Sequence, residues 1–353
     1  MSDSSAMEID AGALAFADHA PPKPRGVTWG ERSALVAALV VYVAVLAAAA
    51  WAVMKVLPDE LSATLAGHTV HVGNLRHRLF SNAVLVFLLL PGALWVEFMT
   101  VGWVRSSVRK FLLARSPSVK TDMAVFVLGQ AHLLDILGKV MLVGLSMVSG
   151  LWIRNWLTAT TGLAINPPDL PVPVLVVAYF FVYTFFDYWT HRLDHSPFFW
   201  PLHRYHHSAE EFCVITAGRV HPAAFTPIFL INIPMAILGA PADVMLYVNV
   251  VVIAVGFLIH SEIGSDWGWF GRWVIQSPVS HRLHHKLDMS YPTGNFAMAP
   301  IWDRLFGTFN AKADPTLAIG VERAYRHGWW FLADVFRDYW HFWKGVFTRR
   351  PIE

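Results

Sequence analysis

Long apolar runs separated by short polar stretches dominate the first two thirds of the chain. Two of them, residues 33–57 and 82–104, are each close to the length with which a helix crosses the hydrocarbon core of a bilayer. A third, from about 136 to 153, contains Lys139, whose long side chain can reach the interface. A fourth covers residues 171–189. The pattern predicts about four transmembrane helices.

A further apolar region, residues 223–259, is interrupted by the stretch Gly239-Ala240-Pro241-Ala242-Asp243. Glycine and proline in such a cluster are typical of a turn, so the region predicts a helical hairpin that re-enters or spans the membrane. The expected fold class is therefore an all-α integral membrane protein.

The two ends of the chain differ from this apolar middle. Residues 1–32 are small and polar, and we interpret them as a disordered tail. Residues 313–353 are rich in arginine, lysine and tryptophan, which favours a helical segment lying against the membrane surface. Between the ends we expect an N-terminal transmembrane region, 33–170, and a histidine-rich unit, 171–312.

Composition supports lipid as the solvent for much of the chain. Apolar residues make up 55% and charged residues 15%, whereas soluble domains carry about 25% charged residues. The net charge of +2 gives no support for a nucleic-acid partner. The single cysteine, Cys213, excludes an internal disulfide framework and CxxC metal sites. A lone cysteine is usually a small apolar filler, although a haem thiolate stays open.

Basic residues in the short loops predict the orientation. The loop 105–120 holds five lysines and arginines, so we place it in the cytoplasm. Counting spans then puts the N-terminus, residues 190–222 and everything after 260 on the cytoplasmic side. The membrane would be the inner membrane of a bacterium or the endoplasmic reticulum of a eukaryote.

Three short blocks hold eight of the 17 histidines. Within each block the histidines are three or four residues apart, a spacing that puts imidazoles on one side of a helix. Neutral imidazole is a good ligand for iron, zinc, copper or nickel. The eight are His191 and His195, then His203, His206 and His207, and finally His281, His284 and His285.

The number of histidines exceeds what one metal ion needs, because a tetrahedral site takes four ligands. Two metals are the natural count. His260, at the end of the hairpin, is a ninth candidate ligand, and His221 is a candidate that we expect rather to support other ligands. The remaining seven histidines are interpreted as ordinary core or surface residues.

Several rival chemistries lack their motifs. The chain has no HExxH zinc-protease motif, no GxSxG nucleophile elbow and no P-loop. The Glu-x-x-His pairs of carboxylate di-iron bundles are also absent. Any iron here would therefore be held mostly by nitrogen.

The order of these motifs resembles the fatty acid hydroxylase/sterol desaturase superfamily. The resemblance rests on DYWTHRLDH at 187–195, HRYHH at 203–207, HP at 221–222, HRLHH at 281–285, GNF at 294–296 and WDRLFGT at 302–308. It covers residues 175–310, and the N-terminal spans carry no motif of the family.

The resemblance implies a membrane oxygenase that uses two non-haem irons and dioxygen to hydroxylate a lipid, such as a fatty acyl chain or a sterol. It maps the metal-binding positions onto the eight block histidines and, less securely, His260. Electrons would come from a separate protein, a reductase with a ferredoxin or a cytochrome b5-type carrier, because no cytochrome b5 motif is fused here.

Polar neighbours of the ligands are candidates for orienting the imidazoles. Asp187, Asp194 and Asp303 would do so through hydrogen bonds, and Asn295 is a further supporting residue or possible ligand. Asp194 is equally well interpreted as a solvated charge on a helix face. Arginines 192, 204, 282 and 304 would pair with these carboxylates or meet a lipid head group.

Other functions remain open at this point. A desaturase or a sterol methyl oxidase would share the same ligands. A non-catalytic haem or metal-binding electron carrier would want histidines inside facing spans, and a metal transporter or sensor would want polar residues repeated through the spans. The sequence leaves the substrate, the position oxidised and the oligomeric state undetermined.

Overall fold

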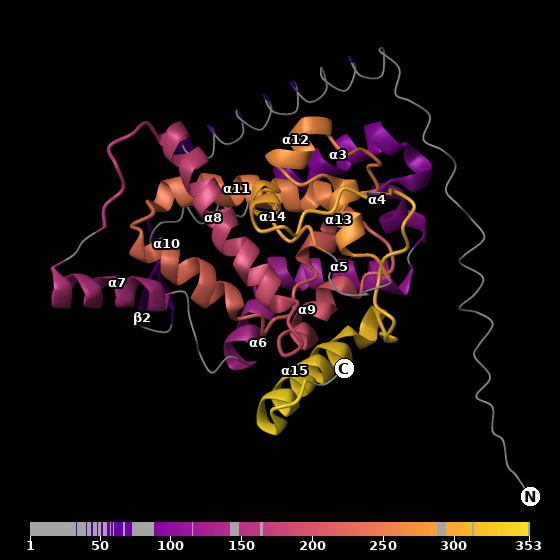
Figure 1. The fold of residues 1–353 in the computed structure, drawn as a ribbon. Helices are drawn as coiled ribbons and strands as arrows, with labels where there is room; N and C mark the ends of the chain where they lie inside the picture. Colours follow the sequence, from indigo (N-terminus) through magenta and orange to yellow (C-terminus); the bar gives the residue numbers. More distant parts are fainter. Residues whose placement is uncertain are drawn as a thin grey trace, which may run out of the picture.

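The computed structural model describes residues 61–65, 68–72, 88–114, 116–141, 148–162, 165–287, 294–312 and 314–351, with isolated positions between 33 and 60. The expected tail, 1–32, lies outside the described residues. So does most of the first expected span, although the described positions from 33 to 56 are helical and exposed. The described part of the chain is helical (Figure 1) apart from one short hairpin.

The helical fold that the sequence predicts is confirmed for the described residues apart from that hairpin. Strands β1 (Leu61–Leu65) and β2 (His68–Val72) pair antiparallel, with Leu61 opposite Val72. The second strand, HTVHV, is rich in β-branched residues, and Gly67 lies between the two strands in the sequence. This is a hairpin pattern, which is easily missed beside the much stronger signal of the apolar runs.

Two helices are long and apolar enough to cross a membrane. They are α8 (Val172–Asp194) and α11 (Ala242–Ile259). Only 28% of the apolar window of each is buried inside the protein. Most of both helices therefore presents apolar surface outward, as a membrane protein does.

Shorter apolar helices accompany them. Helix α3 (Leu90–Val101) falls in the second expected span, whose residues 82–87 lie outside the described part. The expected hairpin begins with η6 (Ile228–Asn232) and α10 (Ile233–Ile237), turns at 238–241 and returns as α11. Its first arm rises about 15 Å, which is half of a bilayer core of about 30 Å.

The third expected span, 136–153, is described only at its two ends. Helix α6 (Leu133–Met141) ends before residues 142–147, which are not described, and α7 (Val148–Thr161) follows. Before α6 come η3 (Trp103–Arg105), α4 (Ser107–Arg109), η4 (Lys110–Ala114) and α5 (Pro117–Gln130).

Short helices form the unit that carries the histidines. The long helices beside this unit pack against each other: α8 contacts α11 and η6 through Tyr179, Ile231 and Val248. Helices α9 and α14 both contact α8, and α13 contacts α11. The remaining elements are α9 (Trp200–His207), η5 (Val214–Gly218), α12 (Gly268–Trp273), α13 (Pro278–His284), α14 (Ile301–Leu305), η7 (Gly328–Trp330) and α15 (Phe331–Thr348).

Candidate metal centre

Nine histidines converge in two groups, and they are the nine that the sequence analysis singled out as ligands. Within each group the ligand nitrogens lie within 4.8 Å of one another. The five-histidine group is His191, His195, His203, His207 and His284, and the four-histidine group is His206, His260, His281 and His285.

Each HxxHH block contributes to both groups. On α9 the first and last histidines of the block join the five-histidine group, and the middle one joins the other. On α13 the assignment is reversed, because only His284 joins the five-histidine group. Residues i and i+4 diverge by about 40° around a helix, whereas i+3 lies about 60° to the other side. The spacing therefore separates the imidazoles between two neighbouring positions.

The two groups adjoin. The rings of His207 and His285, one from each group, are stacked with centroids 4.0 Å apart and an interplanar angle of 17°. His206 and His285 are also close, with centroids 4.7 Å apart within the four-histidine group. A pair of metal ions held by the two groups would be near neighbours.

Hydrogen bonds on the outer side of the rings fix the tautomers. The Nδ1–H of His191 donates to the carbonyl of Phe296 at 2.6 Å, and that of His284 donates to Gly294 at 2.9 Å. A carbonyl oxygen only accepts, so Nδ1 carries the proton and Nε2 carries a free lone pair. In the same way His206 donates to the carbonyl of Arg219 and His260 to that of Gly256.

The free lone pairs face one another inside the site. Nε2 of His281 lies 2.9 Å from Nε2 of His260, which in turn lies 3.3 Å from Nε2 of His206. Lone pairs this close repel unless a cation lies among them. Among the described residues, Nε2 of His191 and both ring nitrogens of His285 are buried without a hydrogen-bond partner. Such unpaired ring nitrogens fit metal ligation, because buried polar groups are otherwise paired.

Burial also keeps the imidazoles neutral. It lowers the pKa of His260 to about 4. Burial and the neighbouring imidazoles together lower the pKa of His203 and His207 well below the usual value. At neutral pH these rings are therefore unprotonated, which is the form that binds metals.

Gln276, which the sequence analysis missed, is the side chain that orients His281. Its Oε1 accepts from Nδ1–H of His281 at 3.0 Å, while its Nε2–H donates to the carbonyl of Asn295 at 2.6 Å. The second bond fixes the amide orientation. Gln276 is 2% exposed, and no motif marked it.

The other predicted supporting residues act at a distance from the rings. Asp303 accepts from the backbone N–H groups of Phe296 and Ala297, and so holds the carbonyl that His191 contacts. Asn295 bonds to the backbone of Asn310 and presents its own carbonyl to Gln276.

Asp194, Asp187 and His221 line a cavity beside the site. Asp194 accepts from the hydroxyl of Thr226 at 2.7 Å and lies 4.0 Å from Nδ1 of His203. His221 belongs to neither group, and both of its ring nitrogens bond to backbone atoms, of Val335 and Ala223.

Two of the four arginines near the candidate ligands pair with carboxylates other than those expected. Arg204 bonds to Asp338 on α15 at 2.7 Å, and Arg282 bonds to Glu262 at 2.8 Å. Arg192 contacts the hydroxyl of Tyr188.

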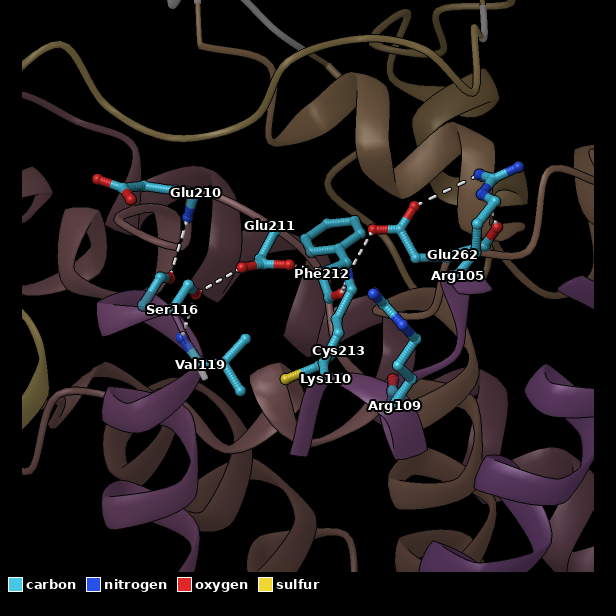
Figure 2. Close-up of polar contacts among 12 residues, drawn as sticks. Arg105, Arg109, Lys110, Ser116, Val119, Glu210, Glu211, Phe212, Cys213 and Glu262 are labelled. Atoms are coloured by element: carbon cyan, nitrogen blue, oxygen red, sulfur yellow. Dashed lines mark hydrogen bonds and ion pairs between the residues drawn. The ribbon is translucent and has the colours of Figure 1, made fainter. Parts of the chain in front are cut away.

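Glu262, Lys110 and Arg105 belong to a charged cluster beside Phe212 (Figure 2). Glu262 bonds to Lys110, Arg105 and Arg282. Lys110 also donates to the carbonyl of Phe212, whose ring lies against His260, His281 and His285. Burial alone would raise the pKa of Glu262, but the cations hold it at about 2.

These features define a histidine-rich membrane protein whose site could hold two metal ions. Residues 176–308 match the family model of the fatty acid hydroxylases. This part of the chain is therefore similar to the fatty acid hydroxylases, and the resemblance seen in its histidine blocks is confirmed.

Two proteins of similar sequence are named as a hydroxylase and a monooxygenase. The chain is 32% identical over 173 residues to an ornithine lipid hydroxylase of Rhizobium tropici, covering 48% of this chain and 51% of that protein. It is 30% identical over 132 residues to an alkylglycerol monooxygenase of Danio rerio, covering 37% of this chain and 29% of that protein. The chain thus spans about half or less of these relatives. No solved structure matches it.

Proposed function

We propose that this protein is a membrane oxygenase that uses two irons and dioxygen to hydroxylate a C–H bond in a lipid. The observation that carries the proposal is the convergence of nine neutral imidazoles in two adjoining groups within a fatty acid hydroxylase domain. Two relatives are named for hydroxylation of an ornithine lipid and mono-oxygenation of an alkylglycerol, which supports a lipid substrate.

The two histidine groups would each hold one iron. Bound iron would supply the activation of dioxygen and the removal of hydrogen from an unactivated carbon. The chain's own task is to keep the lone pairs aimed inward, which for five of the nine histidines is done by bonds from Nδ1 to backbone carbonyls or to Gln276. Phe212 and the cluster around Glu262 exclude water from the outer side of the four-histidine group.

The cavity lined by Asp187 and Asp194 is where the substrate would enter. It has a volume of about 190 Å³ and is lined by His191 and His203 of one group and by His206 of the other. Pockets that enclose a whole small ligand measure about 300–1,000 Å³. The cavity therefore suits a segment of a lipid, with the rest of the molecule left in the bilayer.

The remaining parts of the proposal concern the membrane. About four spans would carry the domain, in the regions 33–170 and 171–312, with the site on the cytoplasmic side as the charge of the 105–120 loop favours. Electrons would come from a separate ferredoxin or cytochrome b5-type carrier with its reductase.

Two alternatives are less well supported. A desaturase or sterol methyl oxidase would use the same ligands, but both relatives quoted above are named for oxygen insertion. An electron carrier with haem between two histidines would need imidazoles on opposite faces of a wide ring, whereas these imidazoles crowd around two points.

The test is to change His203 or His284 to alanine and to measure bound iron and oxygen-dependent lipid product. We expect both to be lost, while His132→Ala, at an exposed position, keeps both. Retention of iron and product by the two ligand variants would contradict the proposal. Comparing the lipids of a deletion strain with those of the wild type would identify the substrate.

A further inference from the structure

Helix α15 places its acidic residues on the inside. Asp334 and Asp338 are 1% and 0% exposed. Asp338 is paired with Arg204 of α9 and accepts from the hydroxyl of Tyr325. Asp334 accepts from the backbone N–H groups of residues 326 and 327 and is paired with Arg337. The inner face of α15 is thus partly ionic.

The outer face of α15 is apolar. Phe336, Trp340 and Phe347 are 51%, 63% and 77% exposed, and Leu332 continues the same row. At 100° per residue these positions lie opposite the buried ones. Trp329 and Trp330 are exposed as well, just before the helix. A helix bordering water would show the reverse pattern, with its charges outside.

We propose that this outer face of α15 lies in the interface of the lipid bilayer. Tryptophan is the side chain favoured at that depth, because its ring is apolar and its N–H is polar. Lys344, Arg349 and Arg350, all exposed at the end of the helix, would meet lipid phosphates. Figure 1 shows α15 at the edge of the molecule, where a bilayer could reach it.

The position of α15 also connects the bilayer to the metal centre. Arg204, which Asp338 holds, lies on α9 between the candidate ligands His203 and His206. His221, whose ring lines the cavity, donates to the carbonyl of Val335 at 2.9 Å. The helix therefore links the lipid surface to the ligand helix and to the wall of the cavity.

Single cysteines make this proposal testable in the full chain. Cys213 is buried at 0% exposure, so an introduced surface cysteine is the one that a nitroxide label reaches. We would label Phe336→Cys, Trp340→Cys and Phe347→Cys in phospholipid vesicles, with Lys312→Cys in an exposed loop as the control. Surface substitutions of this kind usually change stability by about 0.5 kcal/mol or less.

The readout is the collision of the label with oxygen, which concentrates in lipid, and with a nickel chelate, which stays in water. We expect a higher ratio of oxygen to nickel collisions at the three helix positions than at the control. More frequent collision with the nickel chelate than with oxygen would place the face in water. Infrequent collision with both reagents would place it against protein, such as a second copy of the chain or the apolar segment 33–57. Either outcome overturns the proposal.

A second measurement needs no attached label. Brominated lipids quench tryptophans that lie in the bilayer, so Trp340→Phe should reduce the quenched share of the fluorescence. A share equal to that of the wild-type protein would also count against a lipid contact at Trp340.

Discussion

Replacing Gln276 by leucine should weaken metal binding at one of the two proposed positions. The change removes the acceptor for Nδ1–H of His281, and leaves that buried donor unpaired. An unsatisfied buried donor costs about 1–3 kcal/mol. Loss of such supporting groups typically lowers metal affinity about 10- to 100-fold. The imidazole can avoid the cost by moving its proton to Nε2, but Nε2 then no longer offers a lone pair.

The assay is iron content after purification, followed by the rate of iron release to a chelator. Wild-type protein should retain two irons per chain, and Gln276→Leu should lose the iron of the four-histidine group first. Asp303→Asn is the matched control, because it disturbs the carbonyl that His191 contacts in the other group. If Gln276→Leu keeps both irons with unchanged release rates, the bond from Gln276 does not determine how strongly His281 binds metal.

Two other changes test the scaffold around the centre. Arg219→Met should destabilise the protein by about 3–5 kcal/mol, because it strands the fully buried Asp122 without its 2.6 Å partner. Thermal unfolding of the double variant with Asp122→Leu should show a smaller loss, and an equal or larger loss would refute this explanation. The pKa of Glu262 is held at about 2, below its usual 4.5, so its charge stabilises the fold above about pH 4.5 and progressively less as the pH falls toward 2. Glu262→Gln should lower the unfolding midpoint at neutral pH and flatten its decline in acid, and an unchanged profile would count against the cluster.

The nine inward histidines could be chosen from the sequence because their spacing is local. Positions i, i+3 and i+4 of a short helix keep their relation wherever the helix lies, so HRYHH and HRLHH were recognisable before any fold was known. His260 was harder, because it stands alone and only its place at the end of the hairpin pointed to it. The structure adds the partition into groups of five and four, which depends on how α9 and α13 face each other.

The supporting residues could not be found in this way. Gln276 reaches His281 through a bend before α13, and its own amide is fixed by Asn295, 19 residues later. Glu262 meets Lys110 across 152 positions of sequence. Carboxylates near the ligands in sequence were the natural guess. Backbone carbonyls orient four of the nine rings instead, and any residue type supplies a carbonyl.

The division of each HxxHH block between two groups has a mechanical consequence. Neither histidine group is built from one helix alone, because α9 and α13 each contribute histidines to both groups. A rotation of either helix would move ligands of the two positions together, so the packing that holds α9 bears on both. That packing includes the Arg204–Asp338 pair to α15, and on the outer side Phe212 is held by Lys110. The ionic contacts beyond the histidines therefore act as supports for the pair of metal positions rather than for single ligands. This explains why charged side chains such as Lys110, Arg204 and Asp338 are buried in a chain whose charged fraction is only 15%.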